Sequence, residues 1–80
     1  MTYSPGQLAR IEEASRKLVE GYRELSDAFA AAACDAETIG DFRGYRDGAG
    51  LASDYIRWAD RYERQAREAE LMRGRCGYGG

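Results

Sequence analysis

The stretch IGDFRGYRDGAG at residues 39–50 decides the fold of this 80-residue chain. It contains four glycines, two aromatic residues and four charged residues, and it separates two longer segments with helical periodicity. Gly40, Gly44 and Gly48 are spaced by four, so on a helix they would form one bare stripe. Sixteen residues, 35–50, lie between the two periodic segments, and a loop of that length without secondary structure is uncommon in a compact domain, which favours a helix.

The glycines limit the length of this helix. Each interior glycine costs a helix about 0.8–1.0 kcal/mol relative to alanine, so the helix survives only if its bare stripe packs against another backbone. We predict a short helix over residues 37–47, with Asp35 or Thr38 as its cap and a break at residues 48–50.

The segment before this stretch predicts a long helix over residues 5–33. Ser4, Pro5 and Gln7 form a helix start, with the serine as cap and the glutamine completing a capping box. Apolar positions then alternate in steps of three and four, as in a heptad repeat. This first contact row consists of Leu8, Ile11, Ser15, Leu18, Tyr22, Leu25, Phe29 and Ala32. Small residues recur every seven positions beside it and would let a neighbouring helix approach closely, namely Ala14, Gly21 and Ala28.

The segment after the stretch predicts a helix over residues 51–73, with the same periodicity. Its contact row consists of Leu51, Tyr55, Trp58, Tyr62, Gln65, Ala69 and Met72. Alanines again recur every seven positions beside the row, namely Ala52, Ala59 and Ala66. Gly74 is expected to end the helix, and residues 74–80 are expected to form a flexible, disordered tail.

These elements predict an all-α fold with a single helical domain over residues 1–73. Two architectures fit. In an antiparallel helical hairpin the middle segment is the connector or extends the last helix, and in a small three-helix bundle a short second helix reverses the chain. The three-helix form would place Cys34 and Cys76 at the same end, and the hairpin would place them at opposite ends; the sequence does not decide whether they pair. A two-helix hairpin has little core, so we expect a homodimer that forms a four-helix bundle.

The composition argues against catalysis and against metal or cofactor binding. The chain has no histidine, the commonest general base, and its two cysteines are far apart in sequence. Most carboxylates are spaced by four from a basic residue, as on a solvated helix face. The net charge is −2, and neither a membrane span nor a secretory signal is apparent, so the expectation is a reduced, cytoplasmic protein that is not an enzyme.

The candidate contact residues lie mainly in the glycine-containing stretch. Residues 26–54 carry six acidic residues against two arginines, a net charge of −4 that would steer a basic partner. Tyrosine, phenylalanine and arginine are the residue types that most often anchor protein interfaces. The predicted partner-binding set is Asp41, Phe42, Arg43, Tyr45, Arg46 and Asp47.

A second candidate surface is an arginine row on the last helix, formed by Arg57, Arg61, Arg64 and Arg67. Arginines beside Trp58 and Tyr62 could contact single-stranded nucleic acid. Residues 51–80 carry six basic and five acidic groups, however, which is not the clear basic excess of a nucleic-acid-binding domain.

Three functions follow from these patterns. The leading hypothesis is a small non-enzymatic helical protein that binds a larger protein, as an accessory factor or inhibitor. Short, acidic chains without catalytic groups are typical of phage or mobile-element factors, such as anti-CRISPR proteins, and this comparison is by profile only. The alternatives are a self-assembling coiled-coil or four-helix module and a helical nucleic-acid-binding protein.

Overall fold

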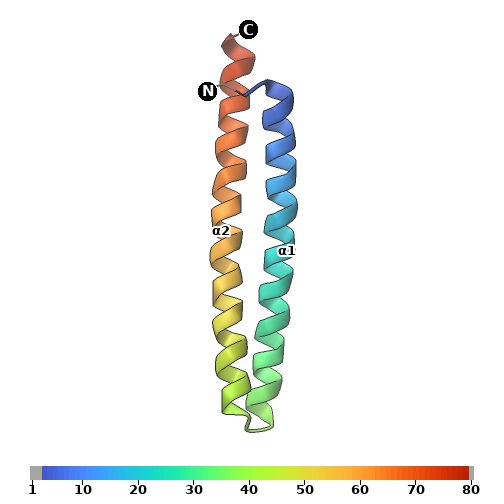
Figure 1. Ribbon diagram of the computed structural model, residues 1–80, viewed down its shortest axis with the longest axis vertical. Helices are drawn as coiled ribbons and strands as arrows, with labels where there is room; N and C mark the ends of the chain where they lie inside the picture. Colours follow the sequence, from blue (N-terminus) through green and yellow to red (C-terminus); the bar gives the residue numbers. More distant parts are fainter. Residues whose placement is uncertain (1–2, 80) are drawn as a thin grey trace.

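The computed structural model describes the backbone of residues 3–79 and the side chains of residues 3–75. It contains α1 (Pro5–Thr38) and α2 (Phe42–Gly79), and the described part has no strand. The two helices lie side by side and antiparallel over their length, in a rod of 61 × 15 × 15 Å (Figure 1). The predicted all-α class is confirmed.

The predicted short helix at 37–47 and the three-helix bundle are wrong. α1 continues past residue 33 to Thr38, and α2 begins at Phe42 and passes through residues 48–50 without a break. The packing of the glycines explains the difference. A Cβ atom built on Gly48 would lie 3.1 Å from both the Ala33 Cβ and the Phe29 carbonyl oxygen, so the bare backbone of α2 lies directly against α1.

Only residues 39–41 connect the helices, and backbone hydrogen bonds define their turn. Gly40 has a φ of 78°, and its N–H donates to the Glu37 carbonyl at 3.1 Å. The Asp41 N–H donates to the Ala36 carbonyl at 2.8 Å, which completes a Schellman motif. Glycine suits this position because it adopts a positive φ without steric cost.

The N-terminal cap of α1 is the predicted one, and the N-terminal cap of α2 is a different residue from those predicted. At α1 the capping box is confirmed, since the Gln7 N–H donates to the Ser4 Oγ at 3.1 Å and the Ser4 N–H donates to the Gln7 Oε1 at 2.8 Å. At α2 the cap is Asp41 rather than Asp35 or Thr38. Its Oδ1 accepts a hydrogen bond from the Gly44 N–H at 3.0 Å.

The far end of α2 also differs from the prediction. The helix continues to Gly79, so Gly74 does not end it. Residue 80 lies outside the described residues, and the flexibility of residues 74–80 stays a prediction. Cys34 is near the loop and position 76 is near the opposite end of the rod, as expected for a hairpin (Figure 1).

Small side chains make most of the contact between the helices. The buried residues of α1 are Leu8, Ser15, Val19, Ser26 and Ala33, and those of α2 include Gly48, Ala52, Ala59, Ala66 and Ala69. The alanines that recur every seven positions on the last helix therefore lie at the contact between the helices. The small residues predicted to do the same on the first helix are exposed instead, namely Ala14, Gly21 and Ala28.

Each predicted contact row is half right. Ser15 and Ala69 are buried, and Tyr22, Phe29, Tyr55 and Tyr62 are partly buried. The large apolar residues in the other half of each row, such as Leu18, Leu25 and Trp58, remain 42% exposed. The residues one position later take their places at the contact, namely Val19, Ser26, Ala52, Ala59 and Ala66. Small residues there allow the two backbones to approach closely.

Two buried serines are satisfied within this contact. The Ser26 hydroxyl donates to the Ala52 carbonyl at 2.8 Å, and the Ser15 Oγ accepts a hydrogen bond from the Gln65 Nε2 at 3.1 Å. Because a buried polar group without a partner is costly, these bonds allow the two serines to be buried between the helices.

Gly50→Ala is expected to stabilise the protein by about 0.8–1.0 kcal/mol, the difference in helix propensity between the two residues. A Cβ atom at Gly50 meets nothing within 4 Å, so the methyl group adds no steric cost. Urea unfolding followed by circular dichroism measures the change. A loss of stability would contradict the continuous helix through this residue.

Candidate protein-binding surfaces

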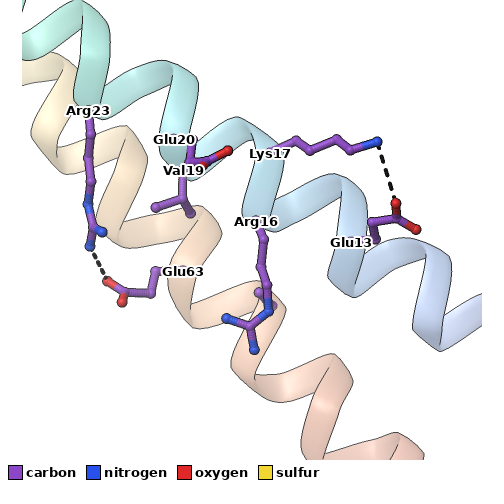
Figure 2. A pocket seen from close by; sticks show the side chains of 8 residues that line it. Glu13, Arg16, Lys17, Val19, Glu20, Arg23 and Glu63 are labelled. Carbon is purple, nitrogen blue, oxygen red and sulfur yellow. Dashed lines mark hydrogen bonds and ion pairs between the residues drawn. The ribbon is translucent and has the colours of Figure 1, made fainter.

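One long side of the hairpin carries a network of charged residues, here called the charged face. Across the helices, the Arg16 guanidinium lies 3.0 Å from the Glu70 carboxylate, and Arg23 lies 3.1 Å from Glu63. Figure 2 shows the Arg23–Glu63 pair beside a shallow groove that Val19 also lines. Exposed ion pairs contribute about 0–1 kcal/mol each to stability, so these pairs stabilise the hairpin only slightly. They make this side of the hairpin polar.

Glu12 is the most enclosed acid of the charged face. It lies 3.1 Å from Arg16 and 2.9 Å from Arg73, and its side chain is only 12% exposed. The glutamate therefore links two arginines from different helices. Its Oε2 lies beside the Arg16 guanidinium and its Oε1 beside that of Arg73, so two positive charges flank this carboxylate.

The other long side is apolar and aromatic. The Tyr22 ring stacks on Tyr55, Trp58 and Tyr62 of α2, with centroid distances of 5.9, 6.4 and 5.7 Å. Phe29 extends the stack, 5.5 Å from Tyr55. These rings join the two helices but remain partly open to solvent.

Half-exposed aliphatic residues continue this side in both directions. Leu18 and Leu25 lie four residues before and three residues after Tyr22, so they share its side of α1. Leu51 and Met72 lie seven before and fourteen after Trp58, so they continue its row on α2. We call this surface the apolar face. It consists of Leu18, Tyr22, Leu25, Phe29, Leu51, Tyr55, Trp58, Tyr62 and Met72.

The loop end of the hairpin is a third surface, here called the tip. Ile39 is 80% exposed and Phe42 is 74% exposed, more than any other large apolar residue described. Tyr45 lies one turn further along α2 and is 42% exposed. The tip comprises these three residues with Asp41, Arg43, Arg46 and Asp47.

The structure brings the predicted partner-binding set together at this tip. All six of its members are exposed and lie in the turn or the first two turns of α2. Asp41 has a structural role as well, because it caps the helix. Ile39 was not included in the predicted partner-binding set, because it was placed inside the predicted short helix. Its position directly before Gly40, as a large apolar residue next to a turn, is the feature of the sequence that could have indicated its exposure.

The second predicted surface is also exposed. Arg57, Arg61, Arg64 and Arg67 all lie on the outer part of α2. The Arg61 guanidinium carbon is 5.3 Å from the centroid of the Trp58 ring, a cation–π geometry. Together with Asp54 and Arg57 these residues line a shallow groove. Contact of this surface with nucleic acid stays a prediction.

Among the residues described, no three histidine, cysteine, aspartate or glutamate side chains gather closely enough to hold a metal ion. Neither helix has, over its described length, an apolar stretch that could cross a membrane. Cys34 is exposed.

Comparison of the chain with protein-family models, curated proteins and solved structures finds no match. Function is therefore inferred from the geometry of the charged face, the apolar face and the tip.

Proposed function

We propose that this protein is not an enzyme and acts by binding a larger protein through the tip of its hairpin. The observation that carries the proposal is the exposure of Ile39 and Phe42, at 80% and 74%. Single exposed apolar residues are common on protein surfaces, but neighbouring large ones at a defined end mark an interaction site.

Hydrogen bonds within the turn define the conformation of the tip. The Schellman turn fixes Gly40 and Asp41, and the Asp41 side chain caps α2 at Gly44. Phe42 and Tyr45 then project from the first turn of a long helix. A contact set on a rigid support loses little conformational entropy on binding, which favours affinity.

The charge of the tip defines the class of partner. Residues 26–54 carry a net charge of −4, whereas the whole chain carries −2, so the rest of the chain carries +2. The loop half of the hairpin is therefore the acidic half. A fitting partner presents an apolar pocket for Phe42 surrounded by basic side chains, which the acidic half would attract.

A basic surface of this kind is typical of proteins that bind nucleic acid. The more specific form of the proposal is therefore an inhibitor that occupies such a surface on a larger complex. Anti-CRISPR proteins are one class of this type. The small size and acidity of the chain support this form by profile.

The test is an affinity purification with three tagged proteins from bacterial lysate, namely the parent chain, Ile39→Ser with Phe42→Ser, and Leu71→Ser. Leu71 is a matched control, because it is 60% exposed but lies on α2 far from the tip. We expect a stoichiometric partner with the parent and with Leu71→Ser, and its loss with the double variant.

Calorimetry with the purified partner then measures the effect. Loss of an interface anchor costs more than about 1 kcal/mol, or roughly a fivefold weaker Kd. Equal affinity of the parent and the double variant, or no partner above the level of an untagged control, would overturn the proposal.

A further inference from the structure

The hairpin is a rod of 61 × 15 × 15 Å and exposes more surface than a compact protein of its size. The solvent-accessible area is 6172 Å² for a mass of 8.9 kDa. A compact monomer of that mass exposes about 4,800 Å², which leaves an excess of about 1,400 Å². The residues fully buried between the helices are mostly alanine and serine, whereas the larger apolar side chains are half exposed.

We propose that a second copy of this chain covers the apolar face, forming an antiparallel four-helix bundle. The proposal concerns a different surface from the tip and does not depend on the proposed function. The heptad spacing of the exposed row supports it. Leu18 and Leu25 on α1, and Leu51 and Trp58 on α2, are seven residues apart, which is the repeat that keeps one face against a neighbouring helix over a long distance.

A stable protein–protein interface buries about 800 Å² on each partner, so a second copy must cover the whole apolar face, which runs along α2 from Leu51 to Met72, or about 32 Å. A second copy also matches the face in length and in chemistry, because both partners then contribute the same aromatic and aliphatic rows. An interface formed by one surface in both subunits is the usual form of a two-fold dimer.

The charge distribution selects the orientation of the second copy. The loop half of the hairpin carries −4 and the half with the chain termini carries +2. An antiparallel arrangement places the acidic half of each copy beside the positive half of the other. A parallel arrangement would instead place the two acidic halves together, which repel one another.

The two-fold axis would then pass near the middle of each hairpin, at the aromatic stack. Tyr22 lies seventeen residues after Pro5 and sixteen before Thr38, so it is at the centre of α1. The Tyr22, Trp58 and Tyr62 rings of one copy would contact those of the other. Aromatic pairs contribute about 0.5–1.5 kcal/mol beyond their buried area, so the centre would be the strongest part of the interface.

Sedimentation equilibrium at protein concentrations of about 10–100 µM tests the association, because dissociation constants in the micromolar range or below leave most chains dimeric there. The parent should have twice its chain mass of 8.9 kDa. Leu18→Ser with Leu25→Ser should weaken the dimer at least tenfold and give the chain mass. The Ile39→Ser, Phe42→Ser tip variant should remain dimeric, which separates this proposal from the proposed function. A parent that sediments as a monomer at the highest concentration would overturn it.

Electron paramagnetic resonance tests the orientation without altering the apolar face. A spin label on the exposed Cys34, in a Cys76→Ser chain, lies twelve residues or about 18 Å along α1 from Tyr22. In the antiparallel bundle the two labels should be about 36 Å apart along the axis. Dilution with unlabelled chain should make this distance signal disappear, because most labelled chains then pair with an unlabelled one. A label separation below about 20 Å would indicate parallel chains and contradict the proposed arrangement. The same measurement applies if the double leucine variant fails to fold.

Discussion

Gly48→Leu is expected to destabilise the hairpin by about 3 kcal/mol, at the upper end of the cost of overpacking. A Cβ atom at this position already lies 3.1 Å from the Ala33 Cβ and from the Phe29 carbonyl oxygen. The carbonyl belongs to the backbone of α1 and cannot rotate away, so the leucine forces the helices apart. A small domain is stable by about 5–15 kcal/mol, so this change removes a large share of its stability.

Urea unfolding at a fixed protein concentration measures the effect, and Gly50→Leu is the matched control. Gly50 is two residues further along the same helix and has nothing within 4 Å of its built Cβ. The control should retain or exceed the stability of the parent, because leucine favours a helix over glycine. If the two leucine variants had equal stability, the close contact of Gly48 with α1 would be disproved.

The ends of the helices could be predicted only where the residues that define an end lie close together in the sequence. Ser4, Pro5 and Gln7 satisfy one another within four residues, so the capping box could be predicted from the sequence and is confirmed. The cap of α2 depends on where α1 ends. The Schellman turn at Gly40 ends α1 and leaves Asp41 as the next residue free to cap, which the spacing of the glycines alone did not indicate.

The glycine-containing stretch was predicted to break the helix because glycine has a low helix propensity. In the structure α2 continues, because Gly48 is buried against α1 and a larger side chain would not fit there. The tertiary contact therefore offsets the intrinsic cost of the glycine. A propensity scale contains no information about such contacts.

The half-correct contact rows have a similar cause. A search for apolar periodicity selects Leu18 over Val19 and Trp58 over Ala59, because it ranks residues by size and hydrophobicity. The contact between two closely packed helices selects the smaller residue of each pair, and the larger one remains half exposed. If a second copy covers the apolar face, the sequence carries two interfaces on adjacent rows, and periodicity alone does not separate them.

The residues of the predicted partner-binding set lie together at the tip for a simple reason. Its members are consecutive or nearly so, and any helix that begins near Phe42 keeps them at one end. Their exposure could not be predicted in the same way. It depends on the architecture, because in the two-helix hairpin no further element of the described residues covers Phe42 and Tyr45.

Tyr22→Ala is expected to destabilise the protein by about 3 kcal/mol, the lower end of the range for truncating a buried aromatic residue, because the Tyr22 ring is only partly buried. Tyr22 is the one residue of α1 whose ring stacks on three rings of α2, at Tyr55, Trp58 and Tyr62. Its loss leaves the middle of the hairpin held mainly by alanines and serines. Thermal unfolding at several protein concentrations measures the change.

Two controls identify the stack as the cause. Tyr22→Phe keeps the ring and should unfold within a few degrees of the parent, since surface hydroxyl changes usually cost less than about 0.5 kcal/mol. Tyr45→Ala removes a ring of equal size that is 42% exposed at the tip, and it should have a small effect. Equal losses for Tyr22→Ala and Tyr45→Ala would show that the stack does not stabilise the hairpin. If the second copy binds at the apolar face, the Tyr22→Ala loss should also grow with protein concentration, because the parent gains stability from association and the variant does not.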